Sequence, residues 1–161
     1  MKEMFDDPEV EAVILVDATN AFNSMNRGTA LHNMYMICPE MATYLVNTYR
    51  SPPSMYIANS NGIEIRCTQG DNAGMSFYSC NTAPLIQLLQ LKAKAMQGWF
   101  ADDSAAAGTL KRVSEWWNCL NENGPTMGYH PNASKTWVIL KDESNIEEAQ
   151  RLFGPKITFC H

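Results

Sequence analysis

The hydrophobic pattern along the chain begins with a short run that is typical of a buried strand. Residues 10–16 (VEAVILV) are nearly all branched and apolar, as in a strand covered on both faces, and the run stops at Asp17. A carboxylate at the end of a buried strand is costly unless it is paired, hydrogen-bonded or bound to a metal. Asp17 is therefore the first residue for which the pattern predicts a chemical role.

Further along, apolar residues recur at helical spacing. The longest such segment, residues 75–96, contains Pro84, where we expect the helix to be interrupted or bent. Thr109 can cap a helix that Gly124 ends, and Ser144 and Glu147 match a capping box for a last helix that ends at Gly154. The predicted helices thus cover residues 29–37, a segment from Pro39 to about Tyr49, residues 75–96, residues 109–123 and a final segment up to Gly154.

Two segments predict hairpins. Residues 54–58 and 63–67 flank Asn-Ser-Asn-Gly, and an Asn-Gly pair between β-prone residues is a strong turn signal. Residues 97–108 (QGWFADDSAAAG) place two aspartates at a turn, and residues 136–140 predict one more strand. The order of elements predicts one α+β domain over residues 1–161, with helices packed on one face of a small, largely antiparallel sheet.

Composition narrows the function. A net charge of −5 argues against this chain gripping nucleic acid by itself, because phosphate contacts require clustered lysine and arginine. No run of about 18 apolar residues occurs, and the acidic start lacks a secretory pattern, so we expect no membrane partner and an intracellular, cytoplasmic or nuclear setting. Five scattered cysteines without a C-x-x-C pair predict free thiols and no zinc site.

Asp102 and Asp103 are the second candidate site. Taken alone, an Asp-Asp pair at a strand end is more often a solvated turn than a metal site, because aspartate side chains hydrogen-bond the local backbone. Three further patterns elsewhere in the chain favour a metal site over a solvated turn. In chain order the four patterns are residues 16–23 (VDATNAFN), 69–71 (QGD), 100–103 (FADD) and 128–136 (GYHPNASKT).

These patterns resemble four motifs of the palm domain of reverse transcriptases, most closely those of retroelements. The resemblance covers about residues 10–141, and four motifs in the right order are far more specific than any one of them. It implies a polymerase palm that catalyses RNA-directed DNA synthesis with two Mg²⁺ ions, for which Mn²⁺ can substitute. Two cations about 3.5–4 Å apart can stabilise both the attacking and the leaving oxygen of an in-line displacement.

The resemblance also implies roles for single residues. Asp17 and Asp102 would bridge the metal ions, and Asp103 would be an accessory carboxylate. Lys135 would protonate the leaving pyrophosphate or neutralise its charge, although a lone lysine before a strand is usually only solvated. The nucleotide would contact Ala18, Phe22, Gln69 and Gly70, with the ring of Phe22 filling the space that a 2′-hydroxyl requires. Core packing is the alternative role for Phe22, and an ordinary loop position is the alternative for Gln69.

The implied partners are an RNA or DNA template with its primer, deoxynucleotides, and the fingers and thumb regions of the same polyprotein, which this sequence does not include. We therefore expect the chain by itself to be inactive. Two other functions stay open: a palm remnant of a mobile element that folds but catalyses nothing, and the palm of an RNA-dependent RNA polymerase. Ala101 and Phe22 argue against an RNA-dependent RNA polymerase. Such a palm usually has glycine at the position of Ala101 and a smaller or polar residue at the position of Phe22.

Overall fold

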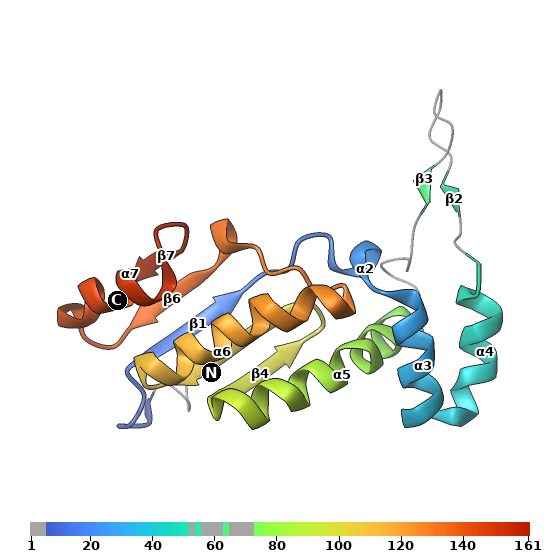
Figure 1. The fold of residues 1–161 in the computed structure, drawn as a ribbon, viewed down its shortest axis with the longest axis horizontal. Coiled ribbons are helices and arrows are strands. Elements are labelled where there is room, and N and C mark those ends of the chain that lie inside the picture. Colours follow the sequence, from blue (N-terminus) through green and yellow to red (C-terminus); the bar gives the residue numbers. More distant parts are fainter. Residues whose placement is uncertain (1–5, 52–53, 56–62, 65–72) are drawn as a thin grey trace.

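The computed structural model describes residues 6–51, 54–55, 63–64 and 73–161, which form a five-stranded mixed sheet with helices packed on it (Figure 1). The strands are β1 (Ala12–Val16), β2 (Ser54–Met55), β3 (Ile63–Glu64), β4 (Met96–Phe100), β5 (Asp103–Gly108), β6 (Trp137–Leu140) and β7 (Thr158–Cys160). The α-helices are α2 (Ala21–Ser24), α3 (Arg27–Ile37), α4 (Pro39–Tyr49), α5 (Gly74–Ala93), α6 (Leu110–Asn123) and α7 (Ile146–Phe153). The 3-10 helices are η1 (Gly124–Met127), η2 (Ala133–Lys135) and η3 (Glu143–Asn145).

Strand β1 is the centre of the sheet, whose order is β4-β5-β1-β6-β7. It pairs antiparallel with β5, where Val16 lies opposite Ser104, and with β6, where Leu15 lies opposite Trp137. Ala12 and Ile14 are completely buried and Val16 is nearly so. The run of branched apolar residues therefore forms the buried strand that its pattern predicts, and the predicted α+β fold is confirmed.

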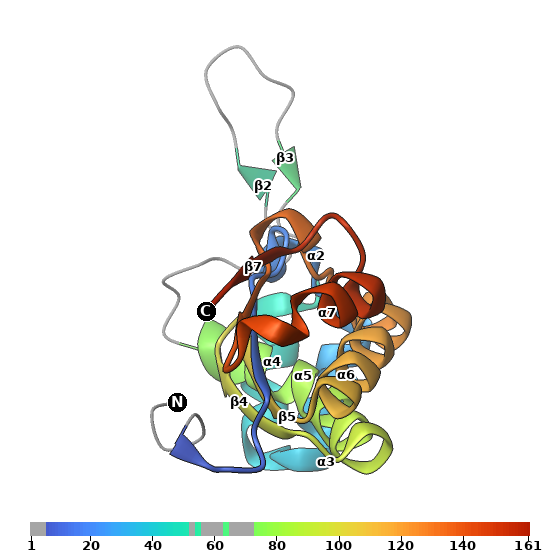
Figure 2. The same ribbon diagram turned by 90° about the vertical axis from the view of Figure 1, so that its left-hand side faces the viewer.

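The helices cover one face of this sheet. Figure 2 shows α5, α6 and α7 on the same side of the strands. Helix α6 buries Val113, Trp116 and Leu120, three of the residues that its periodicity assigns to the inner face. Its first turn is capped by the Thr109 side chain, which accepts a hydrogen bond from the Arg112 N–H, so the predicted cap is confirmed as well.

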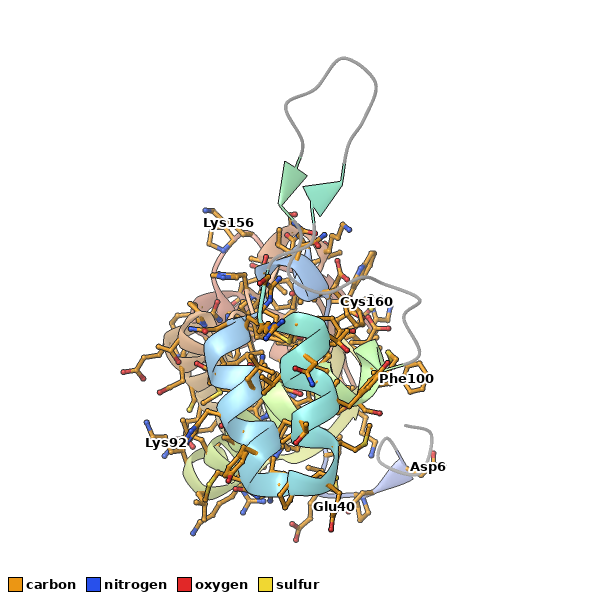
Figure 3. The ribbon with its side chains drawn as sticks, turned by 90° about the vertical axis from the view of Figure 1, so that its right-hand side faces the viewer. Asp6, Glu40, Lys92, Phe100, Lys156 and Cys160 are labelled. Carbon is orange, nitrogen blue, oxygen red and sulfur yellow. The ribbon has the colours of Figure 1, made fainter. Side chains whose placement is uncertain are left out.

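The other side of the sheet, which we call the open face, carries the alternate residues of each strand, because register partners point to the same side. Phe100 and Cys160 both lie on this side, and Phe100 projects away from the body of the molecule (Figure 3). Phe100 is 77% exposed and Trp137 is 47% exposed. By register, the open face consists of Val13, Leu15, Met96, Gly98, Phe100, Asp103, Ala105, Ala107, Trp137, Ile139, Thr158 and Cys160.

Strands β4 and β5 form the predicted hairpin around the two aspartates. Phe100 pairs with Asp103, so Ala101 and Asp102 make a two-residue turn and Asp103 already belongs to β5. Ala101 has a φ of 55°, a left-handed conformation that costs a residue with a Cβ about 1–2 kcal/mol. Strain of this kind persists only where the surroundings hold the backbone in place.

Gln97 ties this hairpin to the helices behind it. Its side-chain oxygen accepts hydrogen bonds from the indole N–H groups of Trp99 (3.1 Å) and Trp116 (3.0 Å). Its side-chain nitrogen donates to the carbonyl of Ile86 on α5 (2.9 Å). One amide on β4 thus anchors the hairpin to both α5 and α6.

Some local predictions are wrong in detail. Helix α5 runs without a break from Gly74 to Ala93, so Pro84 does not interrupt it, and the alternative of a bend at Pro84 stays a prediction. The capping box at Ser144 does not form, because Asp142, two residues earlier, accepts the hydrogen bond of the Ser144 N–H (2.9 Å) and starts η3 instead. Helix α7 then begins at Ile146 and ends before Gly154, as expected.

The structure also contains elements that the sequence does not predict, and it describes some predicted features only in part. Strand β7, which pairs parallel with β6, was not expected from the sequence. The ends of the first predicted hairpin pair as β2 and β3, whereas its Asn-Gly turn lies outside the described residues. Cys38, Cys80, Cys119 and Cys160 are free thiols, and Cys67 is outside the described part. None of the described helices is long and apolar enough to cross a membrane.

Gly128 lies in close contact with the backbone at the end of α2. It has a φ of 78°, and a Cβ there would lie 2.2 Å from the carbonyl oxygen of Ser24 and 2.6 Å from the backbone nitrogen of Asn26. Both atoms belong to backbone, which cannot move aside as a flexible side chain can. Only glycine therefore lets the loop after η1 pass against the end of α2.

We predict that Gly128→Ala lowers the free energy of unfolding by roughly 3 kcal/mol or more, because the new methyl group meets backbone and the φ is unfavourable. Gly98→Ala is the matched control, since a Cβ there meets nothing within 4 Å. Urea unfolding followed by circular dichroism measures both. Equal midpoints for the two variants would contradict the close approach at Gly128.

Candidate functional site

A pocket of about 500 Å³ opens on the open face where β1 ends and β5 begins. Its walls are mostly apolar, and the polar side chains among the lining residues include two aspartates and one lysine. A concave apolar site with a few converging polar groups is the usual form of a ligand pocket. The lining residues are Leu15, Val16, Asp17, Gly98, Trp99, Phe100, Asp103, Ser104, Ala105 and Lys135.

Asp17 and Asp103 meet at this pocket because of the strand register. Val16 lies opposite Ser104 in the antiparallel β1–β5 pair, so the next step outward sets Asp17 opposite Asp103. Directly opposed residues have Cβ atoms about 4.5–5.5 Å apart and point to the same face. Two residues that are 86 positions apart in the sequence therefore present their carboxylates to one space.

Asp102 occupies the tip of the turn and is not among the residues that line the pocket. Its backbone carbonyl accepts a hydrogen bond from the Tyr129 hydroxyl (2.9 Å). Burial raises the pKa of Tyr129 above its ordinary value, the hydrogen bond with Ser104 lowers it, and the negative charges of Asp102, Asp103 and Asp17 raise it further. The Tyr129 phenol therefore stays protonated and can act as the donor of this bond.

The segment from Tyr129 to Asn132 runs alongside the residues that follow β1. The Asn132 N–H donates to the carbonyl of Asp17 (2.9 Å), and the Thr19 N–H donates to the carbonyl of His130 (2.8 Å). Ala18 forms an isolated antiparallel bridge with Pro131 between these two bonds. The fourth motif therefore fixes the backbone of the first.

Lys135 reaches the side chain of the same aspartate. Its Nζ lies 3.1 Å from Oδ2 of Asp17, and the two side chains are 67% and 33% exposed. Asn132 directs this lysine, because its side-chain oxygen accepts from the Ser134 N–H and starts the 3-10 turn η2 that ends at Lys135. The Asn-x-Ser-Lys pattern is thus a turn that delivers an ammonium group to Asp17.

Phe22 is packed inside the protein. It belongs to the core cluster, is 9% exposed, and its ring lies 4.8 Å from that of Tyr78 on α5. Phe22 is not among the residues that line the pocket. The structure thus shows core packing for Phe22, the alternative weighed above, and its role as a sugar gate stays a prediction.

The remaining predicted nucleotide contacts are only partly described. Ala18 is buried beside Asp17, in the bridge to Pro131. Gln69 and Gly70, together with Asp71, lie outside the described residues. The contribution of the second motif therefore stays a prediction from the resemblance.

The donor set at the pocket fits a hard divalent cation. Mg²⁺ takes oxygen ligands and usually binds one or two carboxylates, with water and substrate phosphate completing its shell. Asp17 and Asp103 supply two carboxylates on one pocket. Within the described ranges, no group of three or more His, Cys, Asp or Glu side chains is gathered closely enough to hold a metal ion by protein ligands alone.

Three residues of the site were not predicted as functional candidates from the sequence. Tyr129 donates to the carbonyl of Asp102 (2.9 Å), and Ser104 lies 2.8 Å from the same phenol oxygen. Asn132 holds the backbone of Asp17. All three lie inside or next to the quoted motifs, so polar residues within a motif were the signal. What the sequence could not give is which backbone group each one contacts.

The comparisons with known proteins leave this site to be interpreted from its own chemistry. No protein-family model matches the chain, and no curated protein matches its sequence significantly.

We predict that Lys135→Gln raises the affinity of the chain for Mn²⁺ about threefold to tenfold. The ammonium group competes for Asp17 and repels a second cation by about 1 kcal/mol in a solvated setting. The free energy of unfolding should change by less than about 1 kcal/mol, because the ion pair is exposed to solvent. Electron paramagnetic resonance of free Mn²⁺ measures the affinity, with Lys111→Gln on α6 as control. Unchanged or weaker binding would contradict competition at Asp17.

Proposed function

We propose that the chain is the palm domain of a reverse transcriptase and carries the carboxylates for transfer of a deoxynucleotide to a primer end. The observation that supports this most directly is the meeting of Asp17 and Asp103 at one pocket, with Asp102 at the adjoining turn. The four sequence motifs that resemble the family include all three aspartates. Two of the motifs also contact one another through the bonds between residues 17–19 and 130–132.

Each aspartate has a distinct place in this proposal. Asp17 and Asp103 offer oxygens from the two sides of the pocket, and Asp102 offers a third carboxylate from the tip of the turn. Bound divalent cations would supply positive charge to the attacking hydroxyl and to the leaving phosphate oxygens. The geometry favours Asp103 over Asp102 as the first partner of Asp17, in contrast to the assignment that the sequence suggests.

In this proposal Lys135 acts on the leaving group. It lines the same pocket as Asp17 and Asp103, and its side chain is two-thirds exposed. Once the Asp17 carboxylate binds cations, the ammonium group is free to neutralise a pyrophosphate or donate a proton to it. A point charge on a flexible stem suits a group that moves between two partners.

The template, primer and deoxynucleotide are the partners in this proposal, and fingers and thumb regions would provide the contacts that a chain of net charge −5 lacks. A palm that folds without catalysing anything is the competing function. The two differ in whether the pocket binds a divalent cation and whether the chain supports synthesis when joined to those regions.

The test is primer extension by a longer polypeptide that carries this chain together with fingers and thumb regions. We expect it to extend a DNA primer on an RNA template with Mg²⁺ and deoxynucleotides. Asp17→Asn should lower the extension rate by roughly 10³-fold or more, because it removes a charge from the place where the transition state needs cations. Extension is measured as product length against time.

Asp142→Asn is the matched control. Asp142 caps η3 with its side chain, a role that asparagine fills equally well, and it follows the end of β6 that lies away from Asp17. Its activity should equal that of the wild type. Normal extension by the Asp17→Asn variant would refute the assignment of Asp17. Absence of extension together with absence of Mn²⁺ binding by the wild type would favour the inactive palm.

Phe22→Leu tests the sugar gate without emptying the core. Phe22→Ala would cost about 3–5 kcal/mol, whereas leucine keeps most of the apolar volume against Tyr78. We predict that Phe22→Leu raises the ratio of kcat/KM for ribonucleotides to that for deoxynucleotides at least tenfold. Phe22→Tyr, which keeps a ring of the same size, should preserve the ratio. The same ratio in all three proteins would remove Phe22 from the gate.

A further inference from the structure

The hydroxyl of Tyr129 meets the Asp-Asp hairpin at two points. It donates a hydrogen bond to the carbonyl of Asp102 (2.9 Å) and lies 2.8 Å from Oγ of Ser104. A phenol has one proton, and that proton is used on Asp102, so Ser104 must be the donor of the second bond. Tyr129 therefore hydrogen-bonds to the backbone of Asp102 and to the side chain of Ser104, the two residues on either side of Asp103.

The turn that Tyr129 grips is not held by its own conformational preference. Ala101 has a φ of 55°, which an alanine avoids, and Ala101 and Asp102 are the whole connection between β4 and β5. Rotation of the peptide groups in this turn would turn the Asp102 carbonyl away from Tyr129. The hydrogen bond selects the one turn geometry that the structure shows.

Tyr129 is itself held in a fixed place. Its side chain is completely buried, and its ring packs edge-on against Trp99 with centroids 5.3 Å apart. Its backbone N–H donates to the carbonyl of Gly124 (3.0 Å), and Gly128 before it passes against the end of α2. Tyr129 is therefore held by contacts other than those of the Ala101–Asp102 turn.

The segment that carries Tyr129 also holds the other side of the pocket. Three residues after Tyr129, the Asn132 N–H donates to the carbonyl of Asp17. One short stretch of chain thus contacts the backbone of Asp17 on β1 and the backbone of Asp102 at the hairpin. This stretch therefore supplements the direct β1–β5 pairing by holding the backbone on both sides of the pocket.

We propose that Tyr129 is a positioning residue, whose hydroxyl fixes Asp102 and Asp103 relative to Asp17 so that the carboxylates can bind one divalent cation together. This inference rests on the proposed function. Tyr129 does not line the pocket and would touch neither the cation nor a nucleotide. Its effect would reach the site through the hairpin backbone and Ser104.

A structural role alone would stabilise the fold without changing cation affinity in the folded protein, so affinity is the quantity to measure. The 161-residue chain is titrated with Mn²⁺ and free Mn²⁺ is followed by electron paramagnetic resonance, at a temperature where circular dichroism shows each variant folded. We expect Tyr129→Phe to weaken Mn²⁺ binding at least fivefold. Both hydrogen bonds are lost and the ring is kept.

Tyr78→Phe is the matched control, because Tyr78 is also buried and its hydroxyl has no hydrogen-bond partner among the described residues. Both variants remove one buried hydroxyl, and only Tyr129→Phe releases the turn. The Mn²⁺ affinity of Tyr78→Phe should stay within twofold of the wild type. An equal loss in both variants would overturn the positioning role.

The outcomes separate this inference from the proposed function. Absence of Mn²⁺ binding by the wild type would refute the proposed metal site and this inference with it. Wild-type binding together with unchanged binding by Tyr129→Phe would overturn the inference alone. If Tyr129→Phe does not fold, Ser104→Ala decides: it removes one of the two bonds, a threefold or larger loss of affinity supports the role, and wild-type affinity overturns it.

Discussion

The pairing of β1 with β5 is the constraint on which the rest of the structure depends. Strand β1 is buried on both faces, and a slip of one residue would exchange the faces of every side chain. Such a slip would turn Asp17 toward the helices and the core. The apolar residues of β1 therefore fix where the carboxylate emerges, although they take no part in the chemistry. Opposed like charges are destabilising, and the ammonium group of Lys135 offsets part of that cost.

The segment from Gly128 to Lys135 joins parts that the sheet alone would leave separate. Gly128 packs on the end of α2, the short helix that carries Phe22. Tyr129 contacts the hairpin, Asn132 contacts the backbone of Asp17, and Lys135 contacts its side chain. The contacts come from the backbone of Gly128 and Asn132 and from the side chains of Tyr129 and Lys135, so they depend on a defined path of the chain. A glycine at the start and an Asn-capped turn at the end define that path.

The sequence predicted the elements whose pattern is strong and missed those that tertiary contacts decide. Strand β1, the hairpin at the aspartates and the Thr109 cap of α6 follow from local sequence, and all three are confirmed. Ser144 and Glu147 had a correct local signature, yet Asp142 competed for the same N–H at closer range. Strand β7 is three residues long and depends on its neighbour β6. Three residues are too few for a periodic pattern to predict a strand.

The candidate site shows the same division. Asp17 could be found because a charged residue at the end of an apolar strand requires a partner, and Asp102 and Asp103 because three further motifs accompany them. The arrangement of these aspartates around the pocket could not be predicted, because it depends on strand register and on the two-residue turn at Ala101. Tyr129 was visible only as an aromatic residue after a glycine. Its role depends on a hydroxyl reaching a carbonyl 27 residues away along the chain, and no local pattern encodes such a contact.

Under the proposed function, the charges around the pocket favour binding of cation and substrate together. Among its lining residues within the described part of the chain, Lys135 is the single basic side chain, opposed by Asp17 and Asp103. A phosphate group entering alone would meet the net negative charge of two aspartates and one lysine. A divalent cation reverses that balance and releases Lys135 from Asp17. Coupled binding of this kind makes the affinity for one partner depend on the concentration of the other.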